Sequence, residues 1–359
     1  MANRKSAIVS PSIDNLQSAI GVAARVATFA VLCAMAASCG LYYRAGIGLY
    51  YQEAKLPAAQ VRLAIPYAGP SSTAKQRLNL FLPAAAATGP SAIPFVVFVH
   101  GGNWDAGDRD LKVGGADVYN NIGRYLASHG IGTAVISYRL LPDVTWREQI
   151  ADVATAVRWV NVHAKDYGGT SSCVFVMGHS AGAQLAARVA LDPDTRNGPA
   201  PSICGVIGVS GAAYDLADRA TYDINDDLDW YEARFGGTPD WQDAASPIRF
   251  VRGATMKQVP PFLLLYAGGE GKALQRQSQL MHAALQRAGA SSSLVVVPGE
   301  SHSRIVLTLS RDDKTSGPAI VTFLRGKVEL TIADCGVAID GLRIADFRSA
   351  SLQSAVVNP

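Results

Sequence analysis

The chain has 359 residues, of which 49% are hydrophobic and 17% are charged, and its formal net charge is +3. This composition is that of an ordinary globular protein and excludes a fibrous or disordered chain. Because the net charge is small and no dense basic run is interleaved with aromatic residues, the sequence gives no electrostatic case for nucleic-acid binding.

The N-terminal region has the features of an export signal. Basic residues precede an uncharged run from Val26 to Ser38, which is about the length of the apolar core of a signal peptide. Small residues then lead to Cys39, an arrangement that resembles a bacterial lipoprotein signal in which Cys39 is lipidated after cleavage. The uncharged run continues to Tyr43, close to the lower limit for a membrane span, so a retained anchor is the alternative.

These features predict where the protein is located. We expect residues 1–38 to be a lipoprotein-type export signal or a membrane anchor, and residues 39–58 to be a linker. The protein would then lie in the bacterial cell envelope, facing the periplasm, with membrane association through its N-terminus.

The cysteines agree with export without requiring it. Cys33 and Cys39 belong to the signal region, which leaves Cys173, Cys204 and Cys335, an odd number. A disulfide between Cys173 and Cys204 and a pair of small buried thiols are both compatible with the sequence.

After the linker, two segments alternate between apolar and polar residues on either side of the turn-rich "AGPSSTA". They are "AQVRLAIPY" and "QRLNLFL", and they predict an antiparallel hairpin. Short apolar runs rich in branched aliphatic residues follow, as expected for strands buried on both faces of a parallel sheet. These runs are "PFVVFVH", "GTAVISY", "CVFVMG", "CGVIGVSG", "PFLLLYAG" and "SLVVVPG".

Helical segments alternate with the apolar runs. In residues 146–165, for example, apolar side chains repeat every three or four positions. The alternation predicts an α/β fold with a mostly parallel central sheet, an N-terminal antiparallel hairpin and helices on both faces. Residues 212–259 have few long apolar runs and lie between two strands, so we expect a small helical cap insertion there. Residues 326–359 would form a C-terminal extension, in which "VELTIADCGVAIDGLRIADF" alternates like a strand.

Ser180 lies between Gly178 and Gly182 in "GHSAG", where an apolar run gives way to the helical "AGAQLAARVAL". Glycine lets the backbone turn more sharply than a Cβ permits, so the side chain at the apex can be held out. Ligands bind at the carboxyl ends of parallel strands, and the N-terminus of the following helix favours a developing anion. This strand–turn–helix arrangement resembles the nucleophile elbow of α/β-hydrolases, and it predicts that Ser180 is a nucleophile.

A serine hydroxyl needs a general base within hydrogen-bond reach. Of the six histidines, His302 follows the last apolar run, in "VVVPGESHSRI", where a loop at the carboxyl edge of the sheet can bring an imidazole to Ser180. The other histidines fall in or at the end of helices, precede Gly101 or adjoin Ser180. We therefore expect His302 to be the base.

An acid that orients the base should come between the serine and the histidine in the chain. Glu270 follows the preceding apolar run and is flanked by glycines, and we expect it to be this acid, although aspartate is commoner at such a place. Asp215 is the competing candidate. Glu300 is too close to His302 in sequence to orient it well.

Acyl transfer also needs hydrogen-bond donors where negative charge develops on the substrate oxygen. The segment "HGGNW" follows a buried strand, and its residues His100 and Gly101 lead into Gly102 and Asn103. We expect the N–H groups of Gly102 and Asn103, joined by that of Ala181, to form the oxyanion hole.

The segments "HGGNW", "YRLLPDVTWREQIADVATAVRWV", "GHSAGAQLA", "ASP" and "PGESHSRIV" together resemble the α/β-hydrolase carboxylesterases. Within them, the chain is similar to acetyl esterase-like, kynurenine formamidase-like and isoprenylcysteine methylesterase-like enzymes. The resemblance covers residues 59–325 and implies an α/β-hydrolase domain with Ser180, His302 and Glu270 as its triad. It implies a serine esterase for short-chain or aryl esters that uses no metal or organic cofactor. Asn103 stands where relatives have glycine, alanine or an aromatic residue, which leaves the substrate preference open.

Two other functions remain open, a serine peptidase or amidase/formamidase on the same fold and a catalytically inactive tethered binding protein. The expected partner is a small-molecule ester, and the sequence indicates no oligomeric state.

"DINDDLD" begins like a calcium loop but lacks the glycine and glutamate that such a loop requires, so we read it as an acidic surface. In the cap segment, aromatic residues either line a pocket or pack the cap, packing being the commoner role. They are Trp230, Tyr231, Phe235 and Trp241.

Overall fold

The computed structural model describes residues 47–84, 93–169, 174–192, 202–225, 227–252 and 259–334. The predictions for residues 1–38, for Cys39 and for the end of the chain therefore lie outside the described residues. Within the described ranges, no helix is both long and apolar enough to cross a membrane.

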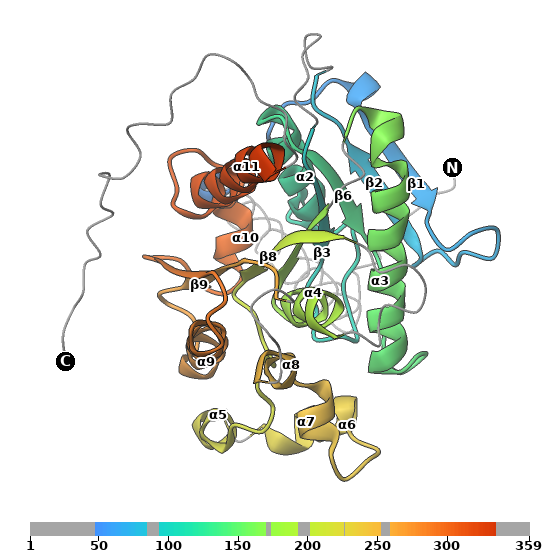
Figure 1. The fold of residues 1–359 in the computed structure, drawn as a ribbon. Helices are drawn as coiled ribbons and strands as arrows, with labels where there is room; N and C mark the ends of the chain where they lie inside the picture. Colours follow the sequence, from blue (N-terminus) through green and yellow to red (C-terminus); the bar gives the residue numbers. More distant parts are fainter. Residues whose placement is uncertain are drawn as a thin grey trace, which may run out of the picture.

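The described residues form an eight-stranded sheet (Figure 1). In sheet order its strands are β1 (Val61–Pro66), β2 (Arg77–Phe81), β6 (Gly132–Ile136), β3 (Phe95–Val99), β7 (Val174–His179), β8 (Ile203–Val209), β9 (Phe262–Ala267) and β10 (Ser292–Val297). β2 pairs antiparallel with both β1 and β6, and the neighbouring pairs from β6 to β10 are parallel. The predicted fold class is confirmed, since each strand lies on a predicted run.

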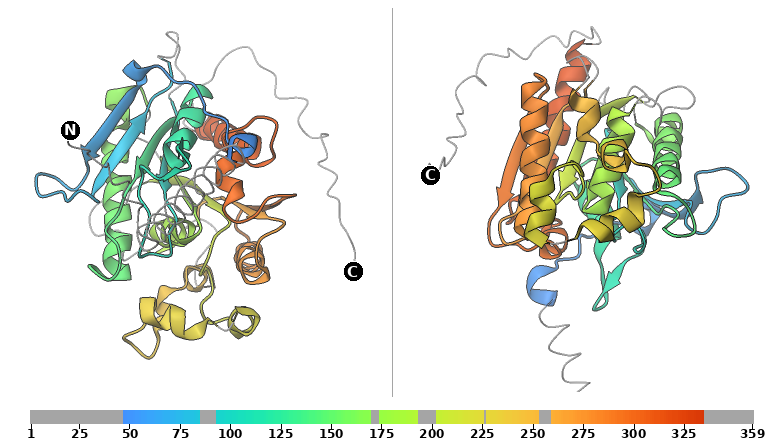
Figure 2. Two further views of the ribbon diagram at one scale, coloured as in Figure 1. Left: turned by 180° about the vertical axis from the view of Figure 1, so that it is seen from behind. Right: turned by 90° about the horizontal axis from the view of Figure 1, so that it is seen from below.

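Helices cover both faces of this sheet (Figure 2). They are α2 (Val118–Ser128), α3 (Trp146–His163), α4 (Ala181–Leu191), α9 (Lys272–Arg287), α10 (Arg304–Thr308) and α11 (Ser316–Asp334). Buried side chains of α3, α4 and α9 share one hydrophobic core, and those of α2, α10 and α11 share a second core. In β3, Val97 belongs to the first core and its neighbours Val96 and Phe98 to the second, because side chains alternate along a strand.

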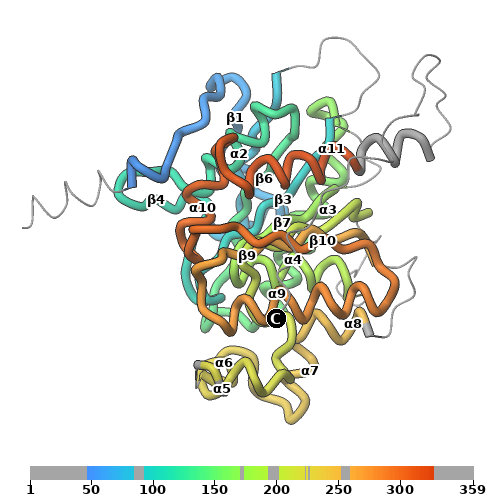
Figure 3. Tube along the Cα trace, turned by 90° about the vertical axis from the view of Figure 1, so that its left-hand side faces the viewer, coloured from blue at the N-terminus to red at the C-terminus, as the bar shows by residue number. Residues whose placement is uncertain are grey.

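Four short helices follow one another in the chain between β8 and β9. They are α5 (Arg219–Asn225), α6 (Leu228–Phe235), α7 (Trp241–Ala245) and α8 (Ile248–Arg252). α5, α6 and α7 lie together at one end of the molecule in Figures 1 and 3. We refer to α5–α8 as the cap.

Smaller elements include helical residues 47–50, the 3-10 helices η1 (Ala58–Gln60) and η2 (Ala164–Tyr167), and a two-stranded hairpin of β4 (Lys112–Val113) and β5 (Ala116–Asp117). The sequence did not predict this hairpin. The strand-like alternation after residue 326 was misleading up to residue 334, because α11 continues through this stretch. Once a helix has begun, each added residue gains a further hydrogen bond, which outweighs a weak local preference for strand.

Cys204 lies in β8 and is disulfide-bonded. Its candidate partner Cys173 lies outside the described residues, immediately before β7, and β7 and β8 are neighbours in the sheet with Val174 opposite Ile203. The pairing of Cys204 with Cys173 stays a prediction.

Candidate active site

Ser180 forms the turn between β7 and α4. Its backbone has φ 53° and ψ −122°, a conformation that costs a non-glycine residue about 1–3 kcal/mol. The two glycines of this turn are required by close backbone contacts. A Cβ on Gly178 would lie 2.1 Å from the carbonyl oxygen of Gly182, and a Cβ on Gly182 would lie 2.2 Å from that of Val99.

Three side chains from distant segments are hydrogen-bonded in series at the carboxyl edge of the sheet. His302, after β10, has its Nε2 3.0 Å from Ser180 Oγ and its Nδ1 2.9 Å from Oε2 of Glu270, which follows β9. Because a carboxylate only accepts hydrogen bonds, Nδ1 carries the proton, which leaves Nε2 to accept from the serine hydroxyl. The residues predicted as nucleophile, base and acid are thus brought together.

The carboxylate that contacts His302 Nδ1 is that of Glu270 and not that of Asp215. The Glu270 side chain is fully buried against a His302 side chain that is 30% exposed. Asp215 accepts a hydrogen bond from the N–H of Ala217, while its own N–H donates to Gln277. Glu300 is also buried, and its carboxylate lies 3.4 Å from Nε of Arg304.

A second histidine, His179, supports the loop that carries His302. Its Nε2–H donates to the carbonyl oxygen of His302 at 3.0 Å, and the two rings lie 4.9 Å apart. Burial lowers the pKa of His179 to about 3, and the nearby His302 makes a smaller contribution in the same direction. Burial likewise lowers the pKa of His100 to about 4, and the ring of His100 stacks on Tyr138 at 4.4 Å. Both histidines are therefore neutral at neutral pH.

The segment after β3 turns sharply beside the elbow. Gly102, Asn103 and Trp104 all have positive φ, of 126°, 55° and 65°. In the described part of the chain, no carbonyl accepts from the N–H groups of Gly102 and Asn103. Ala181 is the first residue of α4, where a helix leaves its N–H groups without intrahelical partners. Among the described residues, the three amides predicted to form the oxyanion hole therefore have no backbone carbonyl as a partner.

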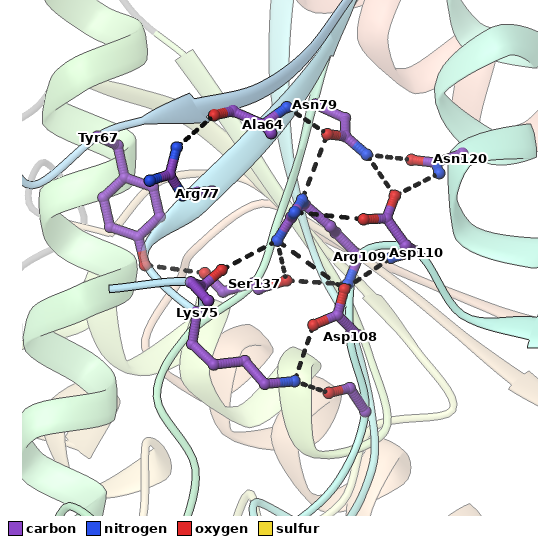
Figure 4. Close-up of polar contacts among 12 residues, drawn as sticks. Ala64, Tyr67, Lys75, Arg77, Asn79, Asp108, Arg109, Asp110, Asn120 and Ser137 are labelled. Carbon is purple, nitrogen blue, oxygen red and sulfur yellow. Dashed lines mark hydrogen bonds and ion pairs between the residues drawn. The ribbon is translucent and has the colours of Figure 1, made fainter. Parts of the chain in front are cut away.

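Polar side chains hold the next part of this segment in place (Figure 4). Lys75 Nζ donates to the carbonyl of Gly107 and to Asp108, both at 2.8 Å. The buried Arg109 donates to Asn79 and Ser137 and lies 3.3 Å from Asp110. Gly107 in turn packs against Gly101, since a Cβ on Gly107 would lie 2.4 Å from the Gly101 carbonyl oxygen. This network, which we call the Arg109 network, anchors the residues that follow the oxyanion-hole amides.

The aromatic residues of the cap pack mainly against Trp104. Phe235 meets the Trp104 ring edge-on at 4.8 Å, and Tyr231 meets it at 6.3 Å. Tyr231, Phe235 and Trp241 are buried, whereas Trp230 is half-buried. These contacts favour the packing role for the cap aromatics.

The acidic segment "DINDDLD" lies across the end of α5 and the start of α6. Among the described residues, no three histidine, cysteine, aspartate or glutamate side chains are close enough to hold a metal ion.

Comparison with known families agrees with this geometry. A model of the BD-FAE family matches residues 78–285, which is more than half of the chain. The chain belongs to the BD-FAE family.

Curated proteins similar to this BD-FAE chain are named as esterases. An isoprenylcysteine α-carbonyl methylesterase of Arabidopsis thaliana is 28% identical over 69% of the chain. The esterase LipC of Mycobacterium tuberculosis is 29% identical over 64% of the chain. Each alignment covers 58% of the relative, so the chain spans little more than half the length of these proteins.

Solved structures similar to the BD-FAE chain share its fold. Esterase B of Lactobacillus rhamnosis, in a structure described as tributyrin phosphonate-inhibited, has a TM-score of 0.65 with 22% identity, covering 87% of this chain and 97% of that one. A truncated carbohydrate esterase from gut microbiota has a TM-score of 0.58 with 20% identity, covering 77% of this chain and all of the other. The α/β-hydrolase fold predicted from the sequence is confirmed.

Three residues near the site of this BD-FAE chain were not predicted. Arg109 joins the segment after β3 to Asn79 of β2, Arg234 of the cap contacts the same segment, and His179 contacts the loop of His302. For His179 the signal was its place beside Ser180, which fixes it within reach of the elbow. Arg109 and Arg234 carry no local signal, because their contacts join segments far apart in the sequence.

Proposed function

We propose that this protein is a serine hydrolase that cleaves carboxylic esters, with Ser180 as nucleophile, His302 as general base and Glu270 as the acid that orients it. The observation that carries the proposal is the unbroken series of hydrogen bonds from Ser180 through His302 to Glu270. The names of the relatives, an isoprenylcysteine α-carbonyl methylesterase and two esterases, support the same reaction class.

The mechanism follows from the positions of these groups. Ser180 Oγ attacks the ester carbonyl carbon while His302 Nε2 takes its proton, and the N–H groups of Gly102, Asn103 and Ala181 bind the oxyanion. Glu270 stabilises the imidazolium that forms. His302 then returns the proton to the departing alcohol, and water repeats the cycle on the acyl-enzyme with His302 again as base.

The substrate class that we propose is short-chain or aryl esters, tested with nitrophenyl esters of increasing acyl length beside peptide anilides. Wild-type protein should turn over the short esters and not the anilides. Ser180→Ala should lose roughly a millionfold in kcat, because removing the nucleophile of such a triad has about this effect. Faster cleavage of the anilides would instead favour a peptidase or amidase.

Glu270→Gln in the same assay tests the acid, with Asp215→Asn as its matched control. The glutamine holds His302 in the wrong tautomer, so kcat should fall by about 10⁴-fold, while Asp215→Asn should stay within a few-fold of wild type. The opposite ranking would assign the acid role to Asp215. If folded wild-type protein cleaves no ester, the proposal that it is an esterase is refuted.

We also propose that the protein is exported to the bacterial cell envelope and tethered there through Cys39. The basic residues, apolar run and small residues before Cys39 support this location.

A further inference from the structure

A charged side chain of the cap is hydrogen-bonded to residues 100–110, which we call the oxyanion-hole segment. Arg234, in the last turn of α6, donates from Nε to the carbonyl oxygen of Asn103 at 3.1 Å and from Nη2 to the carboxylate of Asp105. These contacts join residues about 130 positions apart in the chain. The Arg234 guanidinium also lies over the ring of Trp230, 3.6 Å from its centroid, and is mostly buried.

Arg234 is hydrogen-bonded to Asn103, which lies in a turn with a strained backbone. Asn103 and Trp104 both have positive φ without being glycine, so other contacts must fix them in this conformation. Trp104 is fixed through its carbonyl, which accepts from Gln149 at 2.6 Å and from the N–H of Leu141 at 3.0 Å. Asn103, in contrast, makes no backbone–backbone hydrogen bond with the described residues, and its carbonyl oxygen accepts a hydrogen bond from Arg234.

Successive residues of α6 therefore dock on successive residues of the strained turn. Arg234 binds Asn103, and Phe235 packs edge-on against Trp104 at 4.8 Å. The planar guanidinium suits this position, because it can donate to two oxygens and stack on an aromatic ring at once, which an ammonium cannot do in the same way.

We infer that Arg234 is a positioning residue that holds the Asn103 N–H in the geometry needed to bind the oxyanion, and so couples the cap to catalysis. This inference rests on the proposed function, in which the Asn103 amide is an oxyanion-hole donor. Donors of this kind contribute only when they are aimed at the position that the oxyanion will occupy. Loss of Arg234 should therefore act on the transition state more than on substrate binding.

The test compares Arg234→Ala with Arg249→Ala, a control of the same type. Arg249 is also a cap arginine near an aspartate, at 3.7 Å from Asp243, and near an aromatic ring, that of Phe250. With nitrophenyl acetate, Arg234→Ala should lower kcat and kcat/KM together by about ten- to hundredfold, less than the loss of a whole donor. KM should change less than threefold, and Arg249→Ala should stay within twofold of wild type.

A second measurement reads the oxyanion hole without turnover. Phenylboronic acid forms a tetrahedral adduct with a reactive serine, and one of its oxygens occupies the oxyanion position. Its Kd, measured by calorimetric titration, should rise in Arg234→Ala by about the factor lost from kcat, and Arg234→Lys should recover part of both losses. Thermal unfolding of each variant checks that it is folded at the assay temperature; if Arg234→Ala is not, Arg234→Lys and Arg234→Gln carry the comparison.

Two results would overturn the inference. Folded Arg234→Ala with kcat and boronate Kd within twofold of wild type would mean that the contact is only structural. A rise in KM alone would mean that Arg234 merely shapes the wall of the adjoining cavity of about 400 Å³, to which Arg234, Asp105 and Trp146 all contribute. A wild-type protein that binds the boronate but cleaves no ester would refute the proposed function, and the boronate Kd of Arg234→Ala would then decide separately whether Arg234 positions the oxyanion hole.

Discussion

His179 connects the proposed nucleophile Ser180 to the proposed base His302. It adjoins Ser180 in the chain, and its donated hydrogen bond fixes the backbone of His302. Because burial lowers its pKa to about 3, His179 keeps a neutral ring at neutral pH and does not repel the imidazolium that His302 becomes during the reaction. A charged side chain at this position would oppose catalysis.

The buried histidines predict a stability that falls with acidification. The pKa values of His179 and His100 in the folded state, about 3 and about 4, lie below the value of about 6.5 expected in the unfolded chain. The stabilising contribution is therefore fully present above about pH 6.5 and is lost as pH falls toward these folded-state values, by about 1.4 kcal/mol per pH unit for each histidine.

His179→Gln tests this dependence, because glutamine can still donate to the His302 carbonyl but does not titrate. Urea unfolding between pH 7.5 and pH 4.5 should show a shallower loss of unfolding free energy than in wild type. His163→Gln, which removes an exposed histidine, is the control. If both variants lose stability as steeply as wild type, the acid sensitivity comes from other groups.

At the scale of elements, the oxyanion-hole segment is clamped between two supports. The cap holds it at Asn103, and the Arg109 network of Figure 4 holds it from Gly107 to Asp110 against β2 and the end of β6. The segment itself has no regular secondary structure from His100 to Asp110. Its shape therefore depends on side-chain contacts from elsewhere in the fold together with a few backbone hydrogen bonds, such as that from the N–H of Ala106 to the Gly102 carbonyl.

Arg109→Met should destabilise the protein by about 2–4 kcal/mol, because the substitution removes the guanidinium hydrogen bonds to buried Asn79 and Ser137 and the ion pair with Asp110. Equilibrium unfolding in urea measures the change, with a lower midpoint expected at an unchanged slope. Arg77→Met is the control, since Arg77 donates only an exposed hydrogen bond to the Ala64 carbonyl, and it should change stability by less than about 0.5 kcal/mol. Equal losses in the two variants would contradict a special role for the Arg109 network.

Helices and strands with a regular repeat of apolar residues were predictable from the sequence, whereas the side-chain contacts between these elements were not. The strand β3 and the elbow at Ser180 follow from a five-residue apolar run and from a turn sequence, which are local signals. Glu270 was found because chain order and strand ends restrict the candidates. The α11 helix extends into residues whose alternation of apolar and polar side chains predicted a strand. The role of Arg234 could not be predicted, because its partner Asn103 lies in another part of the chain.

At the scale of the whole molecule, the described body begins at residue 47, shortly after the proposed lipidation site. The chain at this end is attached to the body, since Arg311 donates to the carbonyls of Leu49 and Tyr50, and Asn121 donates to that of Gln52. A lipid on Cys39 would therefore hold the enzyme close to the membrane surface, with only a short connection between them.

Export of the full-length chain in a bacterial host tests this tether. Intact mass of the membrane-extracted protein should show cleavage before Cys39 and a mass increase from attached lipid. Cys39→Ala should lose the lipid, whereas Cys33→Ala, within the expected signal, should keep it. A lipid retained in Cys39→Ala would refute the proposal, and an uncleaved chain would indicate the membrane anchor instead.

The cap leaves the sheet after β8 and returns to it at β9, and these two strands are neighbours. The whole insertion is thus joined to the body at one place, between β8 and β9. Related proteins can therefore carry different caps without disturbing Ser180 or His302. Arg234 belongs to the insertion, whereas Asn103 belongs to the body. A cap transplanted from a relative would therefore need its own cation at the position of Arg234. Without that cation, the recipient would gain a new binding surface but would catalyse its reaction more slowly.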